Sequence, residues 1–501
     1  MTDPATTRSE PTHYRPGTNP AVRLKKRSLA RRLLWPVASL AVLGALAGGV
    51  VLWRMDRTPR EWAAELRRPA TSGLPVLGAA ARATARYLTH ADRLAVAGPV
   101  ALPASLGASA DRSGAVPAGP LRTVASLQAL AAAVADARPG DVIQIQPGQY
   151  RLSDGPIRIT QPGTAAAPIV LRAARLGDVV IESDTVQAFK VSAPYWRFEN
   201  LSLRGVCADH SQCEHAFHVV GAGGFTTIRN NLMTDFNAHI KINAENGVFP
   251  DGGLVEGNTM TESAPRVTAN PVTPVDLVAA SDWVIRGNVI TDFIRQDHTG
   301  GSTYGAFVKG EGEDNVLERN AVICEWKIRT VPGQRVGLSL GGGGTGMALR
   351  RLKGRTGFEQ LGGVIRDNLI AFCSDDGIYV NRAGRSTVDH NTLIDTAGID
   401  LRFVQSSATV TDNIVDGAIK KRDRASLRSW DNDIPFLLDL FAGLHPQRAY
   451  YRDPAVLDLA WRTRPDSVPD PEPRVDLCGN PRGDKALPGA FEDYAVCLRG
   501  Q

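Results

Sequence analysis

The segments VIRGNVI (residues 284–290) and VIRDNLI (364–370) are two copies of a motif that occurs seven times between residues 228 and 415. Each copy has an aliphatic residue, two variable residues, an asparagine, one variable residue and a second apolar residue. The asparagines are Asn231, Asn258, Asn288, Asn320, Asn368, Asn391 and Asn413, spaced 27, 30, 32, 48, 23 and 22 residues apart. A motif repeated every 20 to 50 residues or so indicates a solenoid, and alternating apolar and polar residues rich in β-branched side chains indicate strands. The sequence therefore predicts an all-β solenoid, a parallel β-helix with one coil per motif.

The repeated asparagines are expected to have a structural role. An asparagine at a bend between two strands adopts the left-handed conformation more readily than most residues, and its amide can bond the amide of the next coil. We therefore predict a ladder of stacked asparagines rather than a row of catalytic residues.

The net charge of +5 is concentrated at the N-terminus. Residues 1–32 contain eight Lys or Arg and two acidic residues, which leaves 49 basic and 50 acidic residues in the rest of the chain. Because the rest of the chain is nearly neutral, its charge argues against a nucleic-acid partner.

Residues 33–53 (LLWPVASLAVLGALAGGVVLW) are 21 residues without a charge. This segment is long enough to cross a bilayer, and its basic flank predicts a cytoplasmic tail at 1–32. The chain after Trp53 would then lie in the periplasm or outside the cell. The alternative is a cleaved signal peptide, because residues 45–47 (ALA) are small enough for a cleavage site.

Three further regions follow the predicted transmembrane anchor. Residues 54–120 are rich in Ala, Arg, Pro and Gly without a steady period, and we interpret them as a stem or linker. The β-helix is assigned to residues 121–420. Residues 421–501 are expected to close the solenoid.

The six cysteines fit an oxidising compartment. Cys207 and Cys213 lie six residues apart in one loop. Cys324 and Cys373 occupy similar places after successive motif asparagines, and Cys478 and Cys497 share the C-terminal region. Three local disulfides are the simplest pairing, and no spacing resembles a zinc site.

The two ends of the predicted solenoid carry recognisable sequences. SLQALAAAVADA (126–137) predicts a helix with Ser126 as its N-cap, and PGDVIQIQPGQYRL (139–152) begins the strands. Together they resemble the N-terminal cap of pectin-lyase-like right-handed parallel β-helix proteins. DPAVLDL (453–459) and DLCGNPR (476–482) are similar to the tail of secreted bacterial members. The resemblance covers residues 121–501 and implies a right-handed β-helix with an N-terminal capping helix.

The glycine run at residues 341–344 satisfies a GxGxxG pattern only trivially. No phosphate-loop Lys-Ser/Thr follows it and no βαβ context surrounds it, so we predict no nucleotide partner. A bulged turn, or a loop where a sugar chain approaches the backbone, is expected instead.

Each motif is preceded by a second strand, and alternation sends one residue of each such strand outward. This outward column reads His218, Lys241, Asp276, Phe307, Ser339, Tyr379 and Asp400. A second column holds Asn243, Lys309, Asn381 and Arg402, and His239 lies beside them. Neighbouring rungs are about 4.8 Å apart, so these side chains are predicted to share one substrate-binding groove.

The lysine on one coil with basic residues near it resembles polysaccharide lyases of the chondroitinase B and alginate lyase group. Those enzymes remove the proton beside a uronate carboxylate with a lysine base, aided by an arginine and often by calcium. The resemblance implies Lys241 as base and Arg266 as the arginine, with His239 and Asp276 as neighbours. Asp276 stands where a further arginine would be expected, so a simple ion pair between Lys241 and Asp276 is the alternative.

A second candidate site is SDDGIYVN (374–381), which resembles the strand of polygalacturonase-type hydrolases that carries paired carboxylates. Asp376 and Asp400, on adjacent rungs beside Tyr379, would be the acid and base of an inverting hydrolase. An ordinary turn is the alternative for the Asp-Gly sequence.

Two groups of residues leave the metal question open. His210, His215 and His218 lie near Cys207 and Cys213, where either copper or zinc, or only a disulfide-closed loop, is expected. An acidic edge of Asp235, Glu262, Asp292 and Asp395, each four residues after a motif asparagine, either binds calcium or forms a row of solvated turns.

The sequence thus predicts a membrane-anchored, extracytoplasmic β-helix that acts on an acidic, uronate-containing polysaccharide by β-elimination. The alternatives are a glycoside hydrolase that uses Asp376 and Asp400, and a β-helix that binds envelope glycans without turnover.

Overall fold

The computed structural model describes residues 57–67, 75–95, 98, 100–296, 301–329, 331–342, 344–470 and 472–499, together with Ser39. The chain divides into two compact units, Met1–Met55 and Asp56–Gln501. In the first unit only Ser39 is described, in helical conformation, so the predicted cytoplasmic tail and almost all of the predicted anchor lie outside the described residues. Among the helices that are described, none is both long and apolar enough to cross a membrane.

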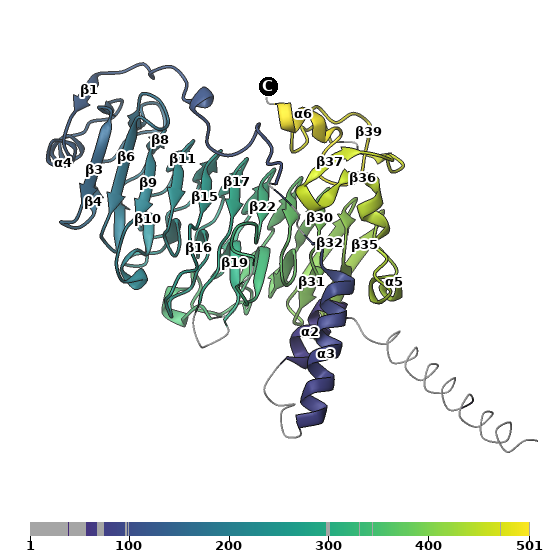
Figure 1. Ribbon diagram of the computed structural model, residues 1–501. Coiled ribbons are helices and arrows are strands. Elements are labelled where there is room, and N and C mark those ends of the chain that lie inside the picture. Colours follow the sequence, from purple (N-terminus) through teal and green to yellow (C-terminus); the bar gives the residue numbers. More distant parts are fainter. Residues whose placement is uncertain are drawn as a thin grey trace, which may run out of the picture. The chain divides into compact units, whose positions relative to one another are not determined.

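The second unit is a parallel β-helix built from three long sheets (Figure 1). Sheet 1 contains β1 (Leu121–Val124), β2 (Val142–Ile145), β5 (Ile169–Ala173), β8 (Trp196–Glu199), β11 (Thr227–Arg229), β14 (Leu254–Glu256), β17 (Val284–Arg286), β21 (Val316–Glu318), β25 (Val364–Arg366), β29 (Ser386–Asp389), β32 (Ser407–Thr411) and β35 (Ser426–Trp430). Sheet 2 contains β3 (Gly148–Leu152), β6 (Val179–Ser183), β9 (Ser202–Gly205), β12 (Leu232–Thr234), β15 (Thr259–Thr261), β18 (Val289–Thr291), β22 (Ala321–Ile323), β26 (Leu369–Ala371), β30 (Thr392–Ile394) and β33 (Ile414–Val415). Sheet 3 contains β4 (Ile157–Ile159), β7 (Gln187–Val191), β10 (His215–Val220), β13 (Ile240–Asn243), β16 (Val275–Val278), β19 (Thr303–Lys309), β23 (Arg335–Gly341), β27 (Ile378–Asn381), β31 (Gly398–Arg402) and β34 (Ala418–Arg422). All neighbouring strands of these sheets pair in parallel, and the predicted all-β solenoid is confirmed.

The core fills the axis of the solenoid with the residues that the alternation predicted. In sheet 3 the inward pairs from Phe217 and Val219 to Ile399 and Leu401 are completely buried. The motif residues three before and two after each asparagine, such as Ile285 and Ile290, are also completely buried. A one-residue slip in register would turn this apolar set outward, so burial fixes the register of each strand.

The seven motif asparagines form the predicted ladder at the bend between sheets 1 and 2. The side-chain oxygen of Asn258 accepts hydrogen bonds from both the backbone N–H and the side-chain amide of Asn231, each at 3.0 Å. The same pair of bonds repeats at every step up to Asn413, which bonds Asn432. Asn432 is an eighth member that the motif missed, because the position three residues before it is the polar Ser429.

The left-handed conformation expected at the asparagines lies one residue earlier. The residues that precede the seven asparagines have φ between 50° and 64°. Each asparagine instead uses its side-chain amide to satisfy backbone carbonyls, as Asn368 does with the carbonyls of Leu317 and Arg366. The bend is therefore made by the preceding residue and held by the asparagine.

The N-terminal end of the solenoid is covered by helix α4 (Leu127–Ala135). The side chain of Ser126 accepts a hydrogen bond from the backbone N–H of Ala129, as predicted for an N-cap. Leu130 and Val134 on the inner face of α4 belong to the solenoid core. Strand β1, just before the helix, was not predicted.

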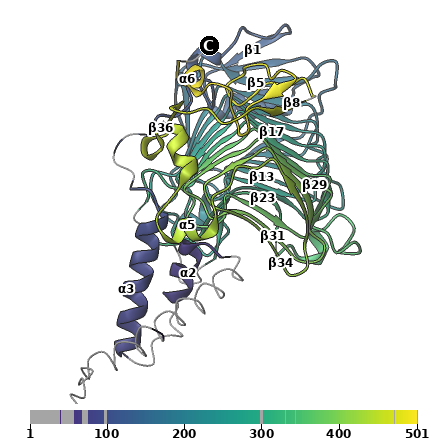
Figure 2. The same cartoon turned by 90° about the vertical axis from the view of Figure 1, so that its right-hand side faces the viewer.

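Two helices precede the solenoid in the region interpreted as a stem. They are α2 (Pro59–Leu66) and α3 (Pro75–Asp92), which pack side by side and project from the side of the solenoid near its last coils (Figure 2). Arg60 of α2 is buried and donates hydrogen bonds to the backbone carbonyls of Cys373 and Asp395. The described part of residues 54–95 thus contains a docked helical pair.

The C-terminal region packs against the outer side of sheet 2 near β22, β26 and β30. It contains α5 (Leu437–Phe441), the antiparallel pairs β36 (Tyr451–Asp453) with β37 (Asp458–Trp461) and β38 (Val468–Pro469) with β39 (Lys485–Ala486), and α6 (Tyr494–Arg499). Apolar residues such as Phe372 of the solenoid, and Tyr451 and Phe491 of this region, form a second core.

All three predicted disulfides are confirmed. They join Cys207 to Cys213, Cys324 to Cys373, and Cys478 to Cys497.

Candidate functional site

The strand register of sheet 3 places the predicted outward residues in one column. His218 pairs with Lys241, Lys241 with Asp276, and the series continues through Phe307, Ser339, Tyr379 and Asp400 to Lys420. We call these eight residues the polar column. Lys241 is partly exposed, but the residues from Asp276 onward are at most 9% exposed. The polar column is therefore aligned as predicted. The expectation of one open groove along its whole length is wrong, because loops and α2 cover the later rungs.

Two lysines surround one buried carboxylate near the middle of sheet 3. Lys241 Nζ lies 2.7 Å from Asp276 Oδ2, and Lys309 lies on the next rung with its Nζ 4.1 Å from the centroid of the Phe307 ring. Burial lowers the pKa of Lys309; Asp276 and Glu359 oppose the shift, and Lys241 and Arg350 add to it. The charge of Lys309 is thus disfavoured by burial and two neighbouring cations and supported by two carboxylates.

Histidines and an amide flank this lysine pair on the preceding rungs. His218 lies between Gln187 (2.5 Å) and Asn243 (2.7 Å), so both ring nitrogens are engaged. Burial lowers the pKa values of His215 and His218, and Lys241 adds to this for both, so the two rings are neutral at pH 7. They therefore contribute no positive charge beside the lysine pair.

His239 and Arg266 do not lie on the polar face, and their predicted positions are wrong. His239 is completely buried, its Nε2 lies 3.3 Å from the carbonyl of Thr261, and burial lowers its pKa to about 3. Arg266 is 3% exposed and donates to Asn237 Oδ1 at 3.0 Å. Both residues belong to turns outside the strands, where the alternation of strand residues does not apply.

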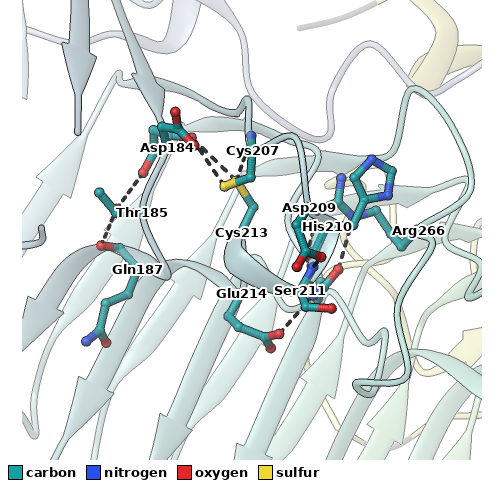
Figure 3. The surroundings of a disulfide bond; sticks show 12 residues. Asp184, Thr185, Gln187, Cys207, Asp209, His210, Ser211, Cys213, Glu214 and Arg266 are labelled. Atoms are coloured by element: carbon teal, nitrogen blue, oxygen red, sulfur yellow. Dashed lines mark hydrogen bonds between the residues drawn. A yellow bond between two sulfur atoms is a disulfide. The ribbon is translucent and has the colours of Figure 1, made fainter.

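The loop beside these rungs is closed by the disulfide between Cys207 and Cys213 (Figure 3). Asp209 accepts a hydrogen bond from the backbone N–H of Ser211, and His210 Nδ1 accepts one from the backbone N–H of Val267. Among the residues that the structure describes, no group of three or more His, Cys, Asp and Glu is arranged to hold a metal ion. The histidine cluster is therefore a disulfide-closed loop, the second of the two expected structures.

The acidic edge is likewise engaged within the protein. Asp235 accepts hydrogen bonds from Ser263, and Asp292 accepts from the backbone N–H groups of residues 326–328. Asp395 pairs with three arginines. Glu262 is buried beside His239 and Arg266, and burial raises its pKa well above the ordinary value. These residues do not form a calcium site.

Gly341, the first residue of the glycine run, lies where two rungs approach closely. It has a φ of 80°, and a Cβ there would lie 1.9 Å from the carbonyl oxygen of Asn381 on the next rung. The glycine is required by this approach of backbone to backbone at the end of β23, where it pairs with Asn381 in regular register.

A cleft of about 850 Å³ lies under α2, beside the last rungs of sheet 3. Its lining includes Glu61 and Ala64 of α2, residues 331–336, and Tyr379 of the polar column. Asp376, Asn381 and Arg402 also line it. The predicted site residues are thus divided between the lysine pair and this cleft, whose residues on β27 lie four rungs beyond Lys241 and two beyond Lys309.

Two carboxylates beside the cleft, those of Glu61 and Asp376, pair with the same ammonium group, that of Lys420. Lys420 Nζ lies 2.5 Å from Glu61 Oε1 and 3.1 Å from Asp376 Oδ1. Burial raises the pKa of Asp376 well above its ordinary value; Lys420 opposes the shift, and Asp375 and Asp400 reinforce it. Asp376 is therefore the carboxyl that holds a proton most strongly.

Asp400 is unsuited to the base role of an inverting hydrolase. It is completely buried, and both of its oxygens accept from Arg422, with the Nε to Oδ1 distance at 3.1 Å. A general base must reach a water molecule, which a buried carboxylate held by arginine does not do. Asp376 and Asp400 are close in register, but they do not form an accessible acid and base.

Asp376→Asn is expected to change how stability depends on pH. Because the pKa of Asp376 is higher in the folded than in the unfolded chain, its proton favours folding at pH below about 4. That contribution is lost as pH rises toward the raised native pKa. The asparagine variant should therefore gain more than about 1 kcal/mol relative to wild type between pH 4 and pH 8. Urea unfolding across this range measures the effect, with exposed Asp154→Asn as control; parallel pH profiles for all three proteins would contradict it.

Several residues of the cleft were missed by the sequence analysis. Thr58, Pro59 and Glu61 form a helix start, in which Thr58 N–H donates to Glu61 Oε2 at 2.8 Å. That capping pattern was readable as TPRE (58–61). Lys420 and Arg422 continue the polar columns by one rung, and AIKKR (418–422) shows the same alternation. The docking of α2 on Lys420 had no local signal.

The comparison with protein families gives one match. Residues 124–278, which are 155 of the 501, match the family model described as chondroitinase B. The matched segment contains Lys241 and Asp276. No curated protein was found to match the chain.

Solved structures with related folds include several polysaccharide-modifying enzymes. Pectate lyase Pel9A is 17% identical, covers 78% of this chain and 100% of its own, and has a TM-score of 0.48. An alginate lyase from Paenibacillus sp. str. FPU-7 is 15% identical, with 63% and 95% covered and a TM-score of 0.35. The A-module of mannuronan C-5 epimerase AlgE6 from Azotobacter vinelandii is 13% identical, with 61% and 89% covered and a TM-score of 0.41. At these identities and TM-scores, no statement about the reaction of this chain rests on them.

Proposed function

We propose that this chain, a pectin-lyase-like parallel β-helix protein similar to chondroitinase B over residues 124–278, cleaves a uronate-containing polysaccharide by β-elimination. The observation that carries the proposal is the cluster of Lys241, Asp276 and Lys309 on sheet 3. Two of these three residues lie inside the matched segment.

The cluster contains the two functions that elimination from a uronate requires. The reaction breaks the C5–H and C4–O bonds and forms the C4–C5 double bond, so it needs a base and a cation that stabilises the developing carboxylate charge. In the register of sheet 3 the two lysines stand on the rungs either side of Asp276, so the cluster offers one amine for each role. We assign proton removal to Lys241, which lies in the matched segment, and carboxylate binding to Lys309.

Lys309 takes the place of the arginine that the sequence resemblance implied. It stands on the rung after Asp276, where its ammonium lies against the Phe307 ring. A cation in this partly desolvated position attracts a uronate carboxylate more strongly than one in open solvent. The leaving glycosidic oxygen takes up a proton, which the ammonium formed on Lys241 can return.

The direct test is turnover of purified protein on polygalacturonate, alginate and chondroitin sulfate. Elimination produces an unsaturated sugar that absorbs in the ultraviolet, whereas hydrolysis produces only new reducing ends. Absorbing products from at least one polymer are expected. New reducing ends without absorbance would replace the proposal with a hydrolase, and binding without either product would make the protein a glycan-binding module.

We further propose that residues 33–53 anchor the protein in a membrane with the β-helix outside the cytoplasm. The support is the uncharged 21-residue segment after a basic tail, together with three disulfides, which persist in oxidising compartments. Alkaline phosphatase fused after Lys421 should be active in intact cells, whereas the same fusion without residues 1–53 should be inactive. Equal activity of the two fusions would contradict the topology.

A further inference from the structure

The cleft under α2 is not used by the proposed elimination. Tyr379 and Asn381 of its lining belong to β27, four rungs beyond Lys241 on β13 and two rungs beyond Lys309 on β19, or about 19 Å and about 10 Å along the sheet. One sugar unit cannot touch both places. The cleft therefore needs its own explanation.

Arg402 differs from the buried arginines of the cleft lining. Those arginines pair with buried carboxylates: Arg60, Arg93 and Arg329 with Asp395, Arg335 with Glu325, and Arg422 with Asp400. The Arg402 side chain is 40% exposed, and its only ion pair with a described residue is with exposed Asp423 at 2.8 Å. An anionic group can therefore reach Arg402 without breaking a buried pair, which favours an anionic ligand.

Buried polar groups in the lining lack partners within the protein. Asn381 is 7% exposed, and its side-chain oxygen has no hydrogen-bond partner among the described residues. Arg335 is 1% exposed, and its Nε also has no hydrogen-bond partner among the described residues. Buried polar atoms without partners are rare in proteins, so these two indicate groups supplied by a ligand or by ordered water.

The remaining side chains suit a sugar. Tyr304 and Tyr379 line the cleft, and the hydroxyl of Tyr379 accepts from the Asn381 amide at 3.2 Å. Asp376 lies beside them, and burial, which raises its pKa, favours the protonated form that can donate to a hydroxyl. Phenol, amide and carboxyl groups next to a guanidinium combine hydroxyl recognition with recognition of one negative charge.

We propose that this cleft is a second carbohydrate site, which holds one acidic sugar unit with its carboxylate against Arg402 and its hydroxyls against Asn381 and Asp376. The ligand class rests on the proposed function, which supplies the uronate. Helix α2 forms the roof, held by the ion pair of Glu61 with Lys420. The site therefore exists only while α2 is docked.

The test is binding of tetrasaccharides of galacturonate, of mannuronate and of neutral galactose to full-length protein carrying Lys241→Ala, measured by calorimetry. This background removes turnover. Ala64→Trp fills the cleft from its exposed position on α2, and Ala83→Trp makes the same change on an exposed position of α3 outside the lining. Arg402→Ala removes the carboxylate partner, with exposed Arg385→Ala as its control.

We expect an acidic tetrasaccharide to bind and the neutral one to bind at least about tenfold more weakly. Ala64→Trp and Arg402→Ala should each weaken binding of the acidic tetrasaccharide about tenfold or more. Both controls should leave it unchanged. Acidic binding that neither cleft variant alters, or no acidic binding at all, would overturn the second site even if wild type releases absorbing products. Binding that the cleft variants abolish, in a protein that makes no such product, would leave the site standing while elimination fails.

Discussion

Replacing Lys241 with alanine is expected to reduce elimination about a thousandfold, because the variant lacks the base that removes the C5 proton. Lys241→Arg should be almost as inactive, since a guanidinium stays protonated and cannot serve as base. Lys309→Arg keeps the positive charge and should retain much of the activity, whereas Lys309→Ala should lose about a hundredfold. Initial rates of ultraviolet absorbance on the active polymer measure all four variants.

The matched control is Lys190→Ala. Lys190 lies two rungs before Lys241 in the same column and pairs with Glu245 at 2.5 Å, as Lys241 pairs with Asp276. Its loss should change the rate less than threefold or so, because surface ion pairs contribute little. If Lys309→Arg is inactive and Lys241→Arg is active, the two lysines exchange roles. If none of the lysine variants is slower than Lys190→Ala, the elimination centre is elsewhere.

Asp395→Ala is expected to be the most destabilising single change, at about 3–5 kcal/mol. Asp395 is completely buried and pairs with Arg60 at 2.8 Å and with Arg93 and Arg329 at 3.0 Å each. Burial alone would raise the pKa of Asp395, but Arg93 and Arg60 hold it below its ordinary value. The contribution of Asp395 to the free energy of unfolding is therefore fully present above the unfolded-state pKa, near 4. It is lost as the pH falls below that value toward the lower pKa of the folded state. Without it, three arginines lose their shared carboxylate.

The measurements for Asp395→Ala are urea unfolding at pH 7 and limited proteolysis of residues 57–95. The control is Asp423→Ala, which removes an exposed aspartate paired with Arg402 and should leave the stability almost unchanged. We expect only the Asp395 variant to expose α2 and α3 to protease. Equal stability and equal cleavage of the two variants would show that the helical pair is held by other contacts.

The sequence was sufficient for the solenoid because its signals are local and repeated. Each copy of the motif gives the register of one coil, so the pairing of His218 with Lys241 and of Tyr379 with Asp400 followed from alternation alone. The family match over residues 124–278 and the parallel sheets agree with the expected resemblance to pectin-lyase-like β-helix proteins. The chain positions of the six cysteines likewise sufficed to pair them.

The site was less predictable because it depends on contacts between distant residues. Alternation places Asp400 outward, but it contains no information on Arg422 closing over it or on α2 covering the rung. His239 and Arg266 were misplaced because turn residues follow no period. From the sequence, Lys241 and Lys309 were assigned to different columns. Only the fold shows that both lie close enough to Asp276 to interact with its carboxylate.

The asparagine ladder has a consequence for how such a protein can change. Consecutive ladder residues are between 19 and 48 positions apart in the chain, yet each makes the same two bonds to the next. The corner of every coil is thus set independently of the length of the excursions between corners. A natural insertion or a grafted loop can therefore enlarge one coil while the spacing between coils stays the same. The range of substrates can change in this way without any change to the strands of the solenoid.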